Sequence, residues 1–127
     1  EFPTYLKKIY LRTIVSKKSL KYIYRKNIVA FTGLAQPKKF LQTLIFAKAN
    51  IIFFKDFPDH YAYSEKEIKK IFNICKNHNA ICVTTEKDYV KIPMNMKKNI
   101  FPVKINLKIE SYKILDKLIE KKTGLSV

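Results

Sequence analysis

Three short, continuous apolar runs alternate with helical patterns in this chain, and this alternation constrains the fold more than any other feature. The runs lie at residues 28–31, 50–54 and 80–84. A strand that is buried on both faces has such an unbroken apolar run. Helical patterns fill the intervals at residues 37–47 and 65–77. The order strand, helix, strand, helix, strand therefore predicts an α/β fold, with a mostly parallel sheet and helices on both faces.

The two ends of the chain carry different signals. The apolar run at residues 100–105 predicts a fourth strand, and Pro102 places that strand at an edge of the sheet, because proline cannot donate a ladder hydrogen bond. Apolar side chains at helical spacing predict a last helix over residues 111–122. Residues 4–25 combine one helical face with β-branched side chains, so a helix and a strand both remain open there.

Chain length and the alternating pattern together predict one α/β domain. The chain has 127 residues, which is the size of a single domain. We assign residues 1–26 to a basic lead-in segment and residues 27–127 to the domain. A sheet of about four strands is small, so we expect it to belong to a larger sheet or to pack against a partner. Because the chain starts without a methionine, we also expect it to continue a longer polypeptide.

The net charge of +16 comes almost entirely from lysine, since Arg12 and Arg25 are the only arginines. Such a charge attracts phosphate groups on nucleic acid, anionic lipid or nucleotides. The lysines are scattered along the whole chain, which favours an ordinary solvated surface over a binding motif. No stretch approaches the roughly 20 apolar residues of a transmembrane helix. Cys75 and Cys82 lack metal-ligand spacing, and we expect buried free thiols in a reducing cytosol.

Three loops follow the predicted strands at their carboxyl ends: the first loop, residues 33–37, the His60 loop, residues 57–64, and the third loop, residues 85–88. Open α/β sheets place their binding sites at this edge, so we expect the three loops to converge. His60 is the residue best suited to proton transfer, because histidine titrates near neutral pH and a carboxylate such as Asp59 can orient it. An ordinary surface histidine and a turn-capping aspartate are the simpler alternatives.

The third loop begins a short helix. Thr85 as N-cap and Asp88 three residues later have the spacing of a capping box, which leaves the side chains of Glu86 and Lys87 free. A helix N-terminus with a lysine can receive a phosphate group, so Thr85, Glu86 and Lys87 are candidate cofactor contacts. The sequence contains no G-x-x-x-x-G-K-[ST] motif. The chain by itself therefore cannot bind ATP in the P-loop manner.

The sequences of these loops resemble one known family. The matching stretches are AFTGLAQPKKF at residues 30–40, FPDHYAYS at residues 57–64 and VTTEKDYVK at residues 83–91. In their order and spacing they resemble the tetraacyldisaccharide 4'-kinases, which phosphorylate the lipid A precursor. The resemblance covers about residues 27–105. Thr32 and Leu34 are mild departures from the family pattern, and neither touches the proposed chemistry.

The resemblance implies an incomplete P-loop-kinase-like, Rossmann-like fold and a bacterial lipid kinase. Such a kinase transfers the γ-phosphate of ATP, with Mg²⁺, to the 4'-hydroxyl of the tetraacyldisaccharide 1-phosphate. In the family, the P-loop and the magnesium-binding acidic residues belong to the N-terminal part, and this chain resembles only the C-terminal part. His60, beside Asp59, corresponds to the histidine that activates the attacking hydroxyl together with an aspartate of the N-terminal part.

Several expectations about partners follow from the resemblance. The expected partners are an N-terminal P-loop half, the lipid A precursor and the anionic surface of the inner membrane, on whose cytoplasmic face the protein would lie peripherally. We expect the chain alone to be inactive. A small nucleic-acid-binding module is one alternative, supported by tyrosines next to lysines but lacking a motif and short of arginine. A non-catalytic fragment that completes another subunit's sheet is a second alternative.

Overall fold

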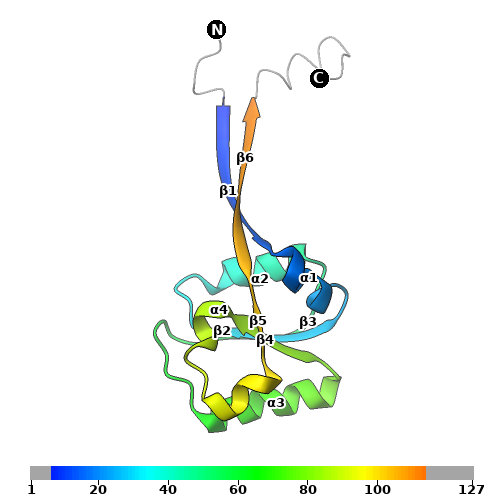
Figure 1. Ribbon diagram of the computed structural model, residues 1–127, viewed down its shortest axis with the longest axis vertical. Coiled ribbons are helices and arrows are strands. Elements are labelled where there is room, and N and C mark those ends of the chain that lie inside the picture. The colour runs from blue at the N-terminus through cyan, green and yellow to red at the C-terminus, as the bar shows by residue number, and fades with distance from the viewer. Residues whose placement is uncertain (1–6, 114–127) are drawn as a thin grey trace. The chain divides into compact units, whose positions relative to one another are not determined.

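The computed structural model describes the backbone of residues 7–113 and the side chains of residues 13–107. Contacts divide the chain into two units. One unit is Thr13–Asn106, and the other combines Glu1–Arg12 with Leu107–Val127. Figure 1 shows the order of the elements along the chain. All three candidate loops belong to the unit Thr13–Asn106.

A four-stranded parallel sheet forms the centre of this unit. Its strands are β2 (Asn27–Thr32), β3 (Asn50–Asp56), β4 (Ile81–Thr85) and β5 (Phe101–Val103). Their spatial order is β3-β2-β4-β5, and each neighbouring pair is parallel. The predicted parallel α/β sheet is thus confirmed. Pro102 lies in β5, at an edge of the sheet, as its missing N–H requires.

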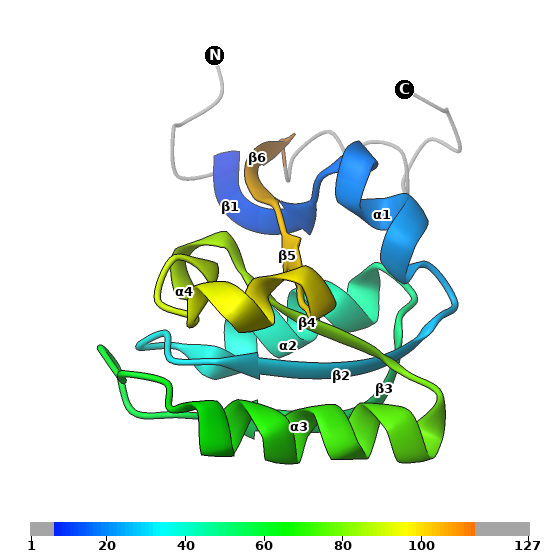
Figure 2. The ribbon, with the colours of Figure 1, turned by 60° about the horizontal axis from the view of Figure 1, so that its bottom comes forward.

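Helices cover both faces of this sheet, as predicted. The helices α2 (Pro37–Phe46) and α3 (Glu65–His78) lie on opposite faces (Figure 2). Pro37 occupies the first turn of α2, where a helix tolerates proline. Ser64 and Glu67 form the predicted capping box at the start of α3. The short helices α4 (Glu86–Tyr89) and η2 (Met94–Asn99) connect β4 to β5.

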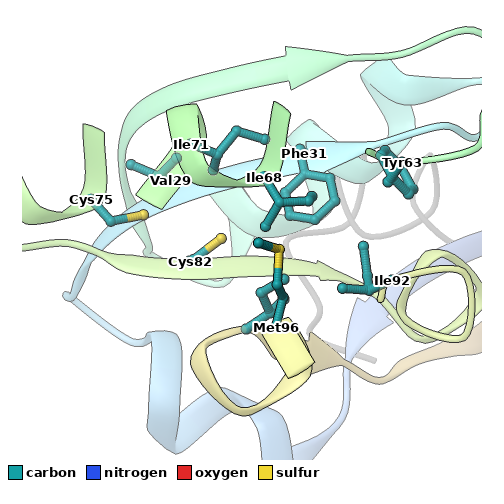
Figure 3. Packing of buried hydrophobic residues seen from close by; sticks show 10 residues of the cluster. Val29, Phe31, Tyr63, Ile68, Ile71, Cys75, Cys82, Ile92 and Met96 are labelled. Carbon is teal, nitrogen blue, oxygen red and sulfur yellow. The ribbon is translucent and has the colours of Figure 1, made fainter. Parts of the chain in front are cut away.

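Side chains of the central strand β2 alternate between two hydrophobic cores, because successive residues of a strand point to opposite faces. Ile28 and Ala30 pack with Phe40 of α2 in one core. Val29 and Phe31 belong to the other core, which α3 covers (Figure 3); it also contains Tyr63, Ile68, Ile71, Cys75, Cys82, Ile92, Met96 and Ile100. All four of these β2 side chains are fully buried. Because both faces of β2 are buried, the sequence of this strand is a continuous apolar run.

The two cysteines are buried free thiols, which confirms that prediction. Cys75 comes from α3 and Cys82 from β4, and Figure 3 shows both within the same core. Their hydrogen bond, together with burial, raises the pKa of the Cys82 thiol. The Cys82 side chain is therefore a neutral core residue.

The lead-in segment contains both of the alternatives that its sequence left open. Strand β1 (Lys7–Val15) comes first, and helix α1 (Lys17–Ile23) follows it, with the Ser16 hydroxyl accepting a hydrogen bond from the Ser19 backbone N–H. Val15 and Ile23 pack in the same core as Ile28. Residues 13–26, which we had assigned to the lead-in segment, thus pack within the unit Thr13–Asn106.

The predicted start of the last helix at Ser111 is wrong. Strand β6 (Ile105–Lys113) runs through this position and forms a two-stranded sheet with β1 (Figure 1). Pairing with a strand from the far end of the chain overrides the local helical spacing there. The rest of the predicted helix, residues 114–122, lies outside the described residues. No helix within the described part is long and apolar enough to cross a membrane.

Candidate active site

The first loop, the His60 loop and the third loop meet at the carboxyl edge of the sheet, as predicted from the strand order (Figure 2). The Phe57 backbone N–H donates to the carbonyl oxygen of Thr32 at 2.8 Å, which joins the start of the His60 loop to the end of β2. A Cβ atom on Gly33 would lie only 3.2 Å from the carbonyl oxygen of Pro58. The first loop and the His60 loop are therefore in direct contact.

The carboxylate of Asp88 binds groups from all three loops. Its Oδ1 accepts hydrogen bonds from the Gly33 backbone N–H and the Tyr63 hydroxyl, both at 3.0 Å. Its Oδ2 accepts from the hydroxyls of Thr32 and Thr85, both at 2.6 Å. The Asp88 side chain is buried, with 1% of its surface exposed. We call these five residues the Asp88 network.

Sequence reasoning found only part of the Asp88 network. Thr85 is the N-cap of α4, and its hydroxyl accepts from the Asp88 backbone N–H at 3.0 Å, as predicted. The Asp88 carboxylate, however, binds side-chain hydroxyls and the Gly33 N–H, which a local capping pattern does not reveal. The sequence signal that bears on the Asp88 network is the apolar run in β2 and in β4. It predicts two buried strands whose carboxyl ends lie at the same edge.

His60 lies at the exposed tip of its loop. Its side chain is 81% exposed, and its backbone has a φ of 61°, in the left-handed region. Asp59 supports it twice: Asp59 Oδ1 accepts from the His60 backbone N–H at 3.0 Å, and Asp59 Oδ2 lies 3.7 Å from His60 Nε2. A left-handed backbone is uncommon for a residue with a side chain. The loop thus presents the imidazole outward, next to a carboxylate.

Aromatic side chains and one carboxylate hold the rest of the His60 loop. Phe57 stacks on Tyr61 at a centroid distance of 5.0 Å, and Tyr63 packs edge-on against Phe31 at 5.2 Å. The Tyr61 hydroxyl donates to Glu67, which raises the pKa of Tyr61 and lowers the pKa of Glu67. Burial, followed by the nearby Asp88 charge, raises the pKa of Tyr63. Tyr63 is thus a hydrogen-bond donor to Asp88 at neutral pH.

The predicted cofactor contacts differ in their environments. Thr85 is buried and its hydroxyl is bonded to Asp88, whereas Glu86 and Lys87 are exposed. All three line a groove of about 450 Å³ beside the third loop, together with the exposed Lys39 and the buried Phe40. His60 is not one of the described residues that line this groove. The three predicted cofactor contacts thus share one groove, and His60 lies on the same edge of the sheet but does not line that groove.

Comparison with known proteins identifies the family. The family model for the tetraacyldisaccharide-1-P 4'-kinases matches residues 2–123. The chain belongs to this family. It is 38% identical over 97 residues to the tetraacyldisaccharide 4'-kinase of Rickettsia typhi, covering 76% of this chain and 30% of that protein. It is 36% identical over 100 residues to the tetraacyldisaccharide 4'-kinase of Rickettsia felis, covering 79% of this chain and 30% of that protein.

The similarity to a solved structure of the family is more distant. A crystal structure of the "apo" form of LpxK from Aquifex aeolicus in complex with ATP aligns with a TM-score of 0.47 and 25% sequence identity, covering 91% of this chain and 35% of that chain. The chain spans about 30% of the length of the curated 4'-kinases that it matches.

The described residues of this chain contain no ready-made set of protein ligands for a metal ion. No group of three or more histidine, cysteine, aspartate or glutamate side chains in the described part lies together as metal ligands would. Asp88 is the carboxylate that joins the three loops, and each of its two oxygens already accepts two hydrogen bonds. A carboxylate offers about four acceptor positions, so Asp88 has none left for a cation.

Proposed function

We propose that this chain supplies the acceptor-activating part of a tetraacyldisaccharide 4'-kinase, which transfers the γ-phosphate of ATP to the 4'-hydroxyl of the lipid A precursor. The observation that carries the proposal is the Asp59–His60 pair, exposed at the carboxyl edge of the sheet. Membership in the 4'-kinase family gives the reaction class. Phosphoryl transfer depends mainly on positioning and charge, and an oriented base is one of the parts it needs.

His60 would accept the proton of the attacking 4'-hydroxyl, or orient that hydroxyl, while Asp59 orients the imidazole. A general base must lie within hydrogen-bond reach of the proton that it removes, and an exposed imidazole at a loop tip can reach a substrate outside its own chain. The His60 side chain is 81% exposed, so it points away from the core. An aspartate of the N-terminal part would complete this arrangement.

ATP and Mg²⁺ would bind mainly to a P-loop half outside this chain. The sequence has no P-loop motif, and the described residues contain no group of three or more histidine, cysteine, aspartate or glutamate side chains that could hold a metal ion. Lys87 is exposed on the third loop and is the cofactor candidate whose charge suits a phosphate group. We therefore propose that the chain alone is inactive, and that a P-loop half is its partner. The lipid substrate implies contact with an anionic membrane surface, which the excess of lysine favours.

Reconstitution tests this proposal. The 127-residue chain is mixed with a separately produced P-loop half of a relative, such as the Rickettsia typhi kinase, and ATP-dependent phosphorylation of the tetraacyldisaccharide 1-phosphate is measured. We expect turnover from the mixture and none from this chain alone. His60→Ala should lower kcat by roughly 10²-fold to 10⁴-fold, which is the usual contribution of a general base.

Two controls separate chemistry from loop structure. His60→Asn should lose as much activity as His60→Ala, because asparagine tolerates the left-handed backbone but cannot transfer the proton. His78→Asn changes the other histidine, which is exposed at the end of α3, and should leave turnover unchanged. No gain over the P-loop half alone would make this chain a non-catalytic fragment, and full activity of His60→Ala would remove His60 from the mechanism.

A further inference from the structure

We propose that Asp88 is a positioning residue, which holds the His60 loop and the third loop in one fixed arrangement without touching the substrate. The proposal rests on the proposed function, because its consequence is the placement of His60 relative to Lys87. The evidence is the Asp88 network, in which one carboxylate joins loops that lie 25 and 55 positions away in the sequence. Asp88 thus has a role in the site beyond its place in the first turn of α4.

Asp88 can act only through the residues that it binds. Each of its two oxygens accepts two hydrogen bonds, which uses the acceptor capacity of a carboxylate. It is also 1% exposed, so no solvent or substrate reaches it. A direct part in proton transfer or metal binding is therefore excluded by its contacts. Its effect on the site must pass through Tyr63, Gly33, Thr32 and Thr85.

Burial makes the Asp88 network stiff. An ionised carboxylate in the protein interior is stable only while hydrogen bonds replace its water. The four donors are all uncharged groups: three hydroxyls and one backbone N–H. Withdrawal of any one of them leaves a buried charge less well compensated, which costs more than a neutral hydrogen bond does. The loops are therefore coupled, since none can move away without weakening the bonds to the others.

Tyr63 carries this coupling to His60. It lies three residues after His60, and its hydroxyl donates to Asp88 while its ring packs edge-on against Phe57 at 5.1 Å. The start of the same loop is fixed by the bond from the Phe57 N–H to the Thr32 carbonyl. Both ends of the His60 loop are thus held, and only its tip is exposed. Fixing a loop before the substrate arrives reduces the entropy cost of ordering it later.

Amide hydrogen exchange on the full 127-residue chain tests the proposal. Tyr63→Phe removes only the hydroxyl that binds Asp88 and keeps the ring. Thr84→Val is the matched control: the Thr84 side chain is also buried and its hydroxyl donates at 2.8 Å, but to the Phe31 carbonyl and not to Asp88. Asp88→Asn removes the charge, and Tyr63→Phe keeps the test valid if Asp88→Asn fails to fold.

We expect Tyr63→Phe to speed exchange in residues 57–64 by roughly tenfold, because it removes a hydrogen bond to a charged group. Asp88→Asn should speed exchange in all three loops. Thr84→Val should leave the ratio of loop exchange rates to strand exchange rates unchanged. In the reconstituted kinase, Tyr63→Phe should lower kcat more than Thr84→Val does when both rates are divided by the fraction of folded protein, and it should leave the KM for ATP unchanged. A general loss of stability would lower the rate only in proportion to the folded fraction.

Two results would overturn the proposal. Equal exchange in residues 57–64 for Tyr63→Phe and Thr84→Val would show that Asp88 holds no loop. The second result is an active mixture in which Tyr63→Phe speeds exchange in the loop as expected but leaves kcat unchanged. The Asp88 network would then be purely structural. The exchange measurement needs no kinase activity, so a failure of the proposed function would appear separately, as an inactive mixture with the coupling of the loops intact.

Discussion

Gly33 is the residue at which the first loop comes closest to its neighbours. A Cβ atom added there would lie 3.0 Å from the Tyr63 hydroxyl and 3.4 Å from Asp88 Oδ1. The distance to the Tyr63 hydroxyl is shorter than ordinary carbon contacts, and the distance to Asp88 Oδ1 is at their lower limit. The first loop therefore needs glycine for space, although its backbone conformation is open to other residues.

We predict that Gly33→Ala destabilises the protein by about 1–3 kcal/mol, the usual cost of overpacking a close-packed site. Urea denaturation measures the change. In a Tyr63→Phe background the nearest atom is absent, so the cost of Gly33→Ala should be smaller there. A cost that is equal in both backgrounds would show that the Tyr63 hydroxyl is not the obstacle.

The raised pKa of Tyr63 predicts that the protein becomes less stable as the pH rises into the alkaline range. Below the ordinary tyrosine pKa of 10.0 the phenol is neutral in both the folded and the unfolded protein, so its contribution to stability is fully present. Above that pH the unfolded chain loses the proton but the folded protein retains it. The free energy of unfolding should then fall by up to about 1.4 kcal/mol per pH unit on account of this residue. Tyr63→Phe should show a shallower decline in urea denaturation between about pH 9 and about pH 11, and equal slopes would contradict the assignment.

At the residue scale, sequence reasoning located His60 and Asp59 on the correct edge but did not find the Asp88 network. The edge follows from strand order, which continuous apolar runs reveal. The bonds of Asp88 to Thr32 and Gly33 span 56 and 55 positions, and no local pattern encodes such a contact. Hydrogen bonds of this kind depend on the folded arrangement of the loops.

Among the elements, those with strong local signals were predicted well. The capping box fixed the start of α3 at Glu65, and the helix extends to His78, one residue beyond the predicted end. Strand β6 was predicted in part as a helix, because its pairing with β1 joins opposite ends of the chain. Pairing between distant strands produces little recognisable pattern in either segment. A helix cap is recognisable because its residues lie within four positions of one another.

The start of α3 also gives a prediction at this scale. The Ser64 hydroxyl accepts from the Glu67 backbone N–H, and Glu67 Oε1 accepts from the Ser64 backbone N–H, both at 3.3 Å. Ser64→Ala should lower the free energy of unfolding by about 1 kcal/mol, as the loss of an N-cap usually does. Ser64→Thr keeps a hydroxyl and should lose less in the same denaturation experiment. An equal loss for both would assign the effect to packing and not to the cap.

In the molecule as a whole, the site is built from segments that are far apart in the chain. The central strand β2 pairs with β3 on one side and with β4 on the other, so the carboxyl edge exists only once both neighbours are in place. The sequence predicted this parallel arrangement, because strands buried on both faces have continuous apolar runs.

The position of Asp88 late in the chain has a consequence for biosynthesis. Thr32 and Gly33 leave the ribosome long before the carboxylate that binds them, since 55 further residues must be translated first. Domains generally fold as units during synthesis, and contacts of large sequence separation form slowly. A nascent chain halted before Asp88 would thus contain His60, but its loop could not yet be fixed by the Asp88 network.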